Sequence, residues 1–216
     1  MNIGQLIFTG ISGLSLTEEE KEFIEQNDIG GVILFANNYE SPAQLAELCN
    51  EIQNFRQKYP LFIGVDQEGG RVIRFKAPFY QPPAMNEVGK HDSPKLCYDI
   101  STIMATQLTG TGVNVNFGPC CDIWSNNANK VIGDRSFGNS PDLVSRMVSA
   151  MIRGYQTSNL IACAKHFPGH GDTTKDSHFD LPIVKTDKKT LDQRELIPFV
   201  KAVKARVEMM MVAHLI

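Results

Sequence analysis

The sequence predicts an α/β fold and, within that class, a (β/α)8 barrel of the TIM type. Three observations support this prediction. Short β-rich runs alternate with longer amphipathic runs along the whole chain, and this alternation is typical of a parallel sheet. The β-rich runs are continuously apolar, as expected of strands that helices cover. Polar side chains follow several of these strands, whereas an open doubly wound sheet would concentrate its chemistry at one switch point.

The predicted strands are short and rich in apolar residues, and each one except the last is followed by a candidate helix. They cover residues 5–10, 31–36, 61–66, 113–117, 160–167 and 207–216. The predicted helices start from recognisable capping residues. Thr17 precedes three glutamates, which indicates an N-cap and an acidic first turn for a helix ending near residue 27.

The next three helices each begin with a Ser-Pro pair, at Ser41, Ser93 and Ser140. Serine caps free backbone amides, and proline suits the first helical turn. The helix from Ser41 carries apolar residues at helical spacing through residue 55, and the other two end near residues 109 and 158. A fifth helix is predicted within residues 188–205.

Six strands and five helices are fewer than a closed barrel requires, which typically takes about 250 residues. We therefore expect residues 1–216 to form one partial catalytic barrel domain that lacks its C-terminal strands and helices. In such an open barrel the first and sixth strands would be edges of the sheet.

Composition excludes several classes of protein. The net charge of −3 argues against a nucleic-acid partner, and no apolar run approaches the length of a membrane span. The start of the chain lacks a signal-peptide pattern, and the five cysteines show no Cys-x-x-Cys spacing. We therefore expect buried, reduced thiols, a cytoplasmic location and no membrane partner, whereas the oligomeric state stays open.

The densest candidate site is residues 165–178, which hold three of the five histidines. Pro168, Gly169 and Gly171 exclude a helix, so we expect a loop at the rim where barrel enzymes keep their catalysts. Asp176 lies two residues before His178. Its carboxylate could accept a hydrogen bond from Nδ1 of His178, leaving Nε2 to exchange a proton as a general acid/base.

A metal site is the alternative for this segment, with His166, His170, Asp172 and His178 as ligands. Their spacing matches no helical zinc motif, and Lys165 lies beside the first candidate ligand. We therefore expect neither a metal nor another cofactor.

Other charged residues follow the remaining strands. Asp66 ends the third strand, Arg74 lies eight residues later, and Arg135 lies in the loop after the fourth strand. Together they suggest a ligand rich in hydroxyl, amide or carboxylate oxygens, although a lone arginine is often half of a salt bridge. Asp122 could orient substrate or cap a helix, and His214 could face the rim or lie in the core.

At this point the motifs resemble a known family. Residues 165–178 resemble the Lys-His-Phe-Pro-Gly-His-Gly-x4-Asp-Ser-His signature of bacterial glycoside hydrolase family 3 β-N-acetylglucosaminidases. Shorter motifs at 66–71 (DQEGGR), 133–137 (GDRSF) and 211–214 (MVAH) follow in the family's order. The resemblance covers nearly the whole chain.

The resemblance implies a retaining exo-β-N-acetylglucosaminidase that releases N-acetylglucosamine from peptidoglycan-derived muropeptides or related oligosaccharides. It implies that His178 is the acid/base, with Asp176 as its partner. It also implies a sugar-binding set, which comprises Asp66, Arg74, Arg135, Lys165 and His166.

The same resemblance places the nucleophile, an aspartate, after the seventh strand, which lies beyond Ile216. The chain would then hold only the acid/base half of a double displacement. Two alternatives remain open: a β-N-acetylglucosaminide phosphorylase, and a truncated fragment without catalytic activity.

Overall fold

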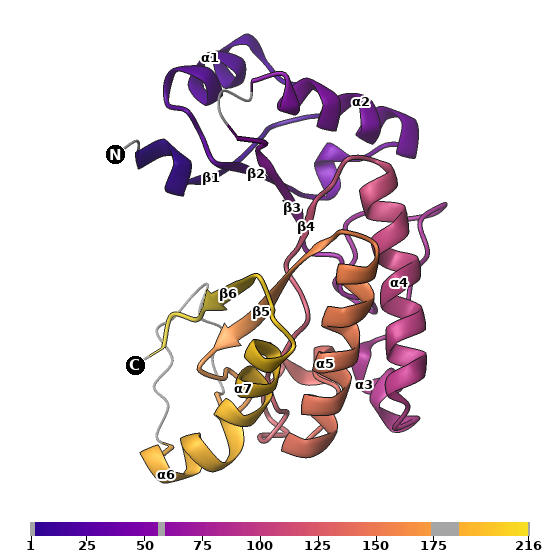
Figure 1. Cartoon of the computed structure of the whole chain (residues 1–216), viewed down its shortest axis with the longest axis vertical. Helices are drawn as coiled ribbons and strands as arrows, with labels where there is room; N and C mark the ends of the chain where they lie inside the picture. The colour runs from indigo at the N-terminus through magenta and orange to yellow at the C-terminus, as the bar shows by residue number, and fades with distance from the viewer. Residues whose placement is uncertain (1–2, 56–58, 174–185, 216) are drawn as a thin grey trace.

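The computed structural model describes residues 3–55, 59–173 and 186–215. Its centre is a sheet of six parallel strands that neighbour one another in chain order. These are β1 (Phe8–Gly10), β2 (Gly31–Leu34), β3 (Phe62–Val65), β4 (Val115–Asn116), β5 (Ile161–Phe167) and β6 (Met209–Val212). The sheet curls into an open half-barrel with β1 and β6 at its two edges, which confirms the predicted incomplete barrel (Figure 1).

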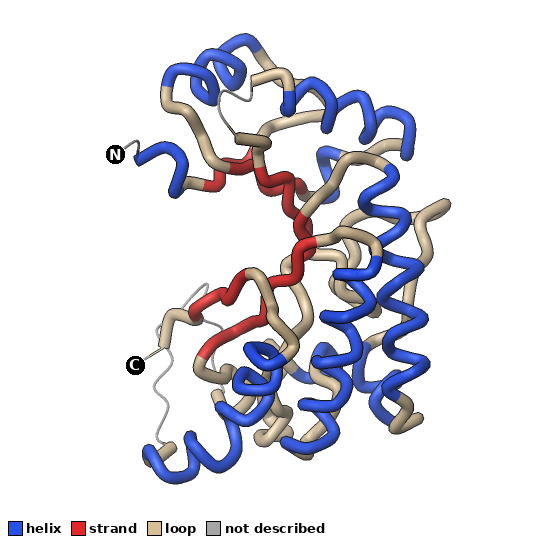
Figure 2. The backbone as a smooth tube through the Cα atoms, viewed as in Figure 1, coloured by secondary structure: helices blue, strands red, loops and turns tan. Residues whose placement is uncertain are grey.

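The helices lie on the convex side of the curled sheet (Figure 2). The long ones are α1 (Glu18–Gln26), α2 (Pro42–Gln53), α4 (Pro94–Gly110), α5 (Pro141–Thr157) and α7 (Leu196–Lys204). Thr17 forms a capping box with Glu20, and the three predicted serine caps each accept a hydrogen bond from the amide three residues later. The capping residues therefore start the helices where the sequence predicts. None of the described helices is long and apolar enough to cross a membrane.

Several elements differ from the prediction. Ile3–Leu6 forms the 3-10 helix η1, so the first strand starts only at Phe8. A Cβ on Gly4 would lie 1.6 Å from the Asn27 carbonyl oxygen, so this segment packs against the end of α1 rather than extending the strand. The remaining short elements are η2 (Ala36–Asn38), α3 (Met85–Lys90), η3 (Gly133–Arg135), α6 (Lys188–Thr190) and the π-helical turn η4 (Leu191–Glu195).

Strand β4 is also shorter than predicted. Asn114 accepts a hydrogen bond from the Ile63 amide through its side chain, and Asn116 accepts one from the Gln67 amide. Backbone bonds to the neighbouring strand continue beyond both ends of β4, since the amides of Asn114 and Phe117 donate to the carbonyls of Ile63 and Val65. Further on, Cys120 forms an isolated parallel bridge with Lys165.

The two faces of the sheet bury different residues. The convex face packs against the helices through residues such as Val32, Ile63 and Ala162, which are fully buried. The concave face carries a second apolar cluster of Val115, Phe117 and Cys163, against which partly buried side chains pack. The alternation of side chains along β3 and β5 therefore continues the concave face to the carboxyl ends of these strands.

All five cysteines are free and buried, as the sequence predicts.

Candidate active site

The candidate site lies where the concave face reaches the carboxyl ends of β3 and β5. Asp66 follows Phe62 and Gly64 on one side of β3, and Lys165 follows Cys163 on the same side of β5. The Lys165 ammonium lies 2.5 Å from Asp66 Oδ1. The curvature of the sheet thus joins two predicted binding residues across the mouth of the half-barrel.

Glu68 is the second partner of Lys165, at 2.6 Å, and it also binds Arg135. Arg135 donates from Nε and Nη2 to the two carboxylate oxygens of Glu68, at 2.9 and 2.8 Å. Burial would raise the pKa of Glu68, but Lys165 and Arg135 lower it to about 2. Glu68 is therefore a fixed anion that holds two cations in place.

Two glycines shape the chain directly after Glu68. Gly69 and Gly70 have φ values of +127° and +54°. A Cβ on Gly69 would lie 2.6 Å from the Pro83 carbonyl oxygen, and one on Gly70 would lie 2.8 Å from Ala84. The positive φ values and the lack of room for a Cβ therefore both require glycine in the tight turn that leaves the strand.

His166 lies beside this cluster and is held by Asp122. The imidazole Nδ1 is 2.7 Å from Asp122 Oδ2, and Nε2 is 3.5 Å from Nη2 of Arg135. Asp122 is fully buried, and its carboxylate also accepts a backbone hydrogen bond from His170 at 2.7 Å. Asp122 thus caps none of the described helices, which was one of the two alternatives from the sequence; its carboxylate instead binds His166 and the amide of His170.

Of the five residues that the resemblance implies for sugar binding, four lie together. Asp66, Arg135, Lys165 and His166 are linked through the contacts above. Arg74 forms no hydrogen bond or ion pair with these four in the part of the chain that the structure describes. Its backbone amide donates to Gln67, and its buried side-chain Nε has no partner among those residues.

The predicted dyad of Asp176 and His178 lies outside the described residues. The described residues that flank it are close together, because the Thr186 hydroxyl donates to Asp172 at 2.6 Å. Arg194 also binds Asp172, at 3.0 Å. The described residues on either side of this segment therefore meet at Asp172.

Of the four predicted metal ligands, His166, His170 and Asp172 lie in the described residues, and His178 lies outside them. Asp172 is paired with Arg194. The one described group of three potential ligands is Cys120, Asp122 and His166, whose ligand atoms lie within 4.8 Å of one another. Asp122 already accepts hydrogen bonds from both of the others, and the Arg135 cation lies beside His166. These hydrogen bonds hold the three side chains together in the described residues.

His214 follows β6 and is exposed, so it is not a core histidine.

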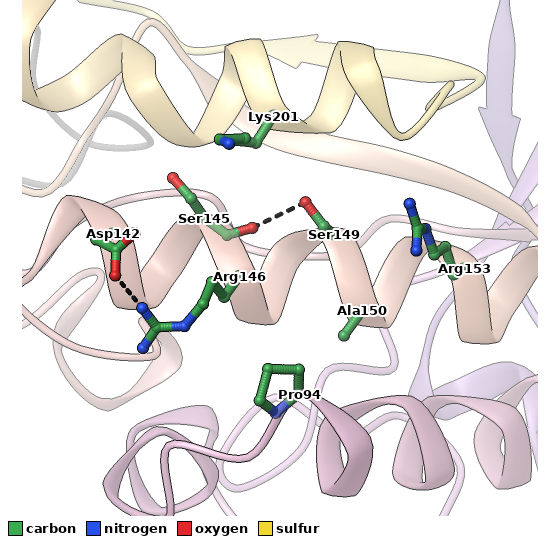
Figure 3. Close-up of a pocket in the computed structure, with 8 residues that line it drawn as sticks. All are labelled: Pro94, Asp142, Ser145, Arg146, Ser149, Ala150, Arg153 and Lys201. Carbon is green, nitrogen blue, oxygen red and sulfur yellow. Dashed lines mark hydrogen bonds and ion pairs between the residues drawn. The ribbon is translucent and has the colours of Figure 1, made fainter.

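A separate groove lies on the outer surface, between α4, α5 and α7 (Figure 3). It is lined by Pro94, Asp142, Ser145, Arg146, Ser149, Ala150, Arg153 and Lys201. Arg146 pairs with Asp142 and with Asp92. The groove contains none of the predicted site residues.

The sequence reasoning missed Glu68 and the role of Asp122. Glu68 lies two residues after Asp66, so the strand alternation that placed Asp66 on the concave face also pointed to Glu68. Asp122 carried no such signal, because only the pairing of Cys120 with Lys165 brings it beside His166.

The whole chain, residues 1–216, matches the family model described as Glycosyl hydrolase family 3 N terminal domain. The chain is 37% identical to the "Beta-hexosaminidase" of Thiobacillus denitrificans over 222 residues, which cover all of this chain and 61% of that protein.

Two solved structures are also similar. A glycoside hydrolase family 3 β-N-acetylglucosaminidase from Paenibacillus sp. matches with a TM-score of 0.96 and 38% identity, covering 100% of this chain and 41% of that one. NagZ from Neisseria gonorrhoeae, in complex with N-trifluoroacetyl-D-glucosamine, matches with a TM-score of 0.92 and 35% identity, covering 97% of this chain and 63% of that one. This chain thus spans less than two thirds of the length of each of these relatives.

Proposed function

This chain belongs to glycoside hydrolase family 3, and on that premise we propose that the protein carrying it is a retaining exo-β-N-acetylglucosaminidase. Its substrates are N-acetylglucosamine-containing oligosaccharides, such as the muropeptides released during cell-wall recycling. The names of the relatives, β-hexosaminidase and β-N-acetylglucosaminidase, support the substrate class. The five free thiols support a reducing, cytoplasmic location.

One observation carries the proposal: the buried cluster in which Lys165 and Arg135 share Glu68 beside Asp66 and His166. Such a cluster presents fixed donors and acceptors at the strand ends, where barrel enzymes bind their substrates. Because the charges neutralise one another locally, the site suits a neutral, hydroxyl-rich ring with an amide group better than a highly charged ligand.

The chemistry proposed for this site uses two steps. His178, oriented by Asp176, donates a proton to the departing oxygen while a carboxylate attacks the anomeric carbon and forms a glycosyl-enzyme. His178 then takes a proton from water, which releases the sugar with retained configuration. By the family resemblance, the attacking aspartate lies beyond residue 216.

The experiment is to assay the full-length protein on p-nitrophenyl β-N-acetylglucosaminide. We expect turnover, initial release of the β-anomer by proton NMR, and little turnover of the matching β-glucoside. His178→Ala should reduce the rate by about 10²–10⁴. His91→Ala, a change of the same kind at an exposed histidine, should leave the rate unchanged.

Equal turnover by the wild type and His178→Ala would refute the role of His178. A rate that depends on added phosphate, with a sugar phosphate as product, would identify a phosphorylase instead.

A further inference from the structure

Asp122 is buried between the sugar-binding cluster and the loop that follows β5, and its carboxylate forms hydrogen bonds with both. Its Oδ1 accepts the backbone amides of His170 at 2.7 Å and His166 at 3.3 Å. Its Oδ2 accepts from the His166 ring at 2.7 Å and from the Cys120 thiol at 3.1 Å. In each of these contacts the carboxylate accepts the hydrogen bond.

The state of this carboxylate determines where the His166 proton lies. Burial opposes the ionisation of Asp122, but His166 and the amide of His170 hold its pKa well below the usual range. An ionised carboxylate only accepts hydrogen bonds, so Nδ1 of His166 must carry a proton.

Arg135 determines the state of the other ring nitrogen. Its Nη2 lies 3.5 Å from Nε2 of His166, and a guanidinium only donates. A proton on Nε2 would set two donors, and in the imidazolium two cations, against each other. The arrangement therefore places the ring lone pair on Nε2, where it faces Arg135.

We propose that Asp122 is a positioning residue that fixes His166 in the Nδ1–H tautomer, so that Nε2 accepts from Arg135 and holds this cation beside the sugar site. The part of this proposal that concerns substrate rests on the proposed function, whereas the tautomer itself does not.

Asp122→Asn tests the proposal because asparagine has nearly the volume of aspartate but replaces one acceptor oxygen with a donor NH₂ group. The backbone amides of His166 and His170 remain donors, so they take the single side-chain oxygen of the asparagine. Its NH₂ group must then face Nδ1 of His166 and donate to it. The ring proton moves to Nε2, which points toward Arg135 and can then no longer accept a hydrogen bond from it.

The first measurement is the ¹⁵N NMR spectrum of the histidine rings in the full-length protein, with His166 assigned by its loss in His166→Gln. We expect a protonated Nδ1 and an unprotonated Nε2 in the wild type and in Cys120→Ala, which removes a neighbouring donor to the same carboxylate. We expect the reverse, or a mixture of tautomers, in Asp122→Asn. A wild-type ring protonated on Nε2 would overturn the proposal even if the asparagine variant did not fold.

The second measurement separates binding from chemistry on p-nitrophenyl β-N-acetylglucosaminide. Asp122→Asn should raise KM about tenfold, because His166 would no longer accept from Arg135 and hold it beside the sugar, with a smaller change in kcat. Cys120→Ala should change KM less than twofold. Equal KM values in the wild type and Asp122→Asn would refute the link to substrate. A wild type with the expected tautomer but no activity would refute the proposed function and leave the role of Asp122 toward His166 standing.

Discussion

The Lys165 ammonium lies 2.6 Å from Glu68 Oε1, and both side chains are almost completely buried, at 2% and 4% exposure. Asp66 approaches the same ammonium at 2.5 Å. One lysine thus pairs with two carboxylates at the mouth of the half-barrel, and Arg135 supplies the second positive charge. Burial lowers the pKa of Lys165, but Glu68 and Asp66 outweigh that effect and raise it, so the lysine stays charged.

Replacing this lysine should destabilise the protein strongly. Lys165→Met keeps most of the side-chain volume but leaves Asp66 and Glu68 without their shared cation. Breaking a buried ion pair in this way costs about 3–5 kcal/mol, which urea unfolding at pH 7 would measure. Lys95→Met is the matched control, because Lys95 pairs with Asp99 while its side chain is 83% exposed, and it should have little effect. Equal losses in the two variants would contradict the role assigned to Lys165.

Glu68 makes a contribution to stability that depends on pH. Its pKa is about 2 in the folded protein, against an ordinary 4.5. A lowered pKa stabilises the fold above the ordinary value, and the benefit is lost as pH falls from about 4.5 toward about 2. Glu68→Gln should therefore lower the free energy of unfolding by roughly 3 kcal/mol at pH 7. The difference in stability between the wild type and the variant should become steadily smaller as the pH falls. Glu87 forms an exposed ion pair with Lys90, so the control variant Glu87→Gln should differ little from the wild type in its free energy of unfolding at every pH.

Glu195 should show the opposite dependence on pH. Burial raises its pKa despite the neighbouring Arg194, and one of its buried oxygens has no hydrogen-bond partner among the described residues. A raised carboxyl pKa favours the fold at low pH, and that benefit is lost as pH rises through the folded-state value. In thermal unfolding, the melting temperature of Glu195→Gln relative to that of the wild type should thus be higher at pH 7 than at pH 4. A difference that stayed constant or shrank with rising pH would contradict this assignment.

Residues 1–216 expressed alone should hydrolyse p-nitrophenyl β-N-acetylglucosaminide negligibly, because the proposed nucleophile lies outside them. The rate of the purified chain would be compared with that of the full-length protein at equal concentration. Robust turnover by residues 1–216 would require another nucleophile within them.

Much of this architecture could be predicted, because helix caps and apolar runs in the sequence mark where the helices and strands form. The Ser-Pro pairs at Ser41, Ser93 and Ser140 start their helices as expected, and the apolar runs become neighbouring strands in chain order. The prediction was wrong where packing overrode local preference. Gly4 fits so closely against Asn27 that a predicted strand begins as a 3-10 turn.

The site was less predictable, because its geometry depends on contacts between distant segments. The sequence could list charged residues at strand ends but could not show that Glu68 bridges Lys165 and Arg135. Nor could it show that Arg74 makes no hydrogen bond or ion pair with this cluster in the described part of the chain. Ion pairs of this kind follow from the curvature of the sheet rather than from spacing along the chain.

The most direct test of the central claim, that this cluster is the sugar-binding site, is a crystal structure of the full-length protein with N-acetylglucosamine bound. We predict that the sugar ring lies within hydrogen-bonding distance of Lys165 and Arg135 and in contact with His166. A sugar bound elsewhere, for example in the outer groove beside Arg153 and Lys201, with the cluster left untouched at saturating ligand, would contradict the account.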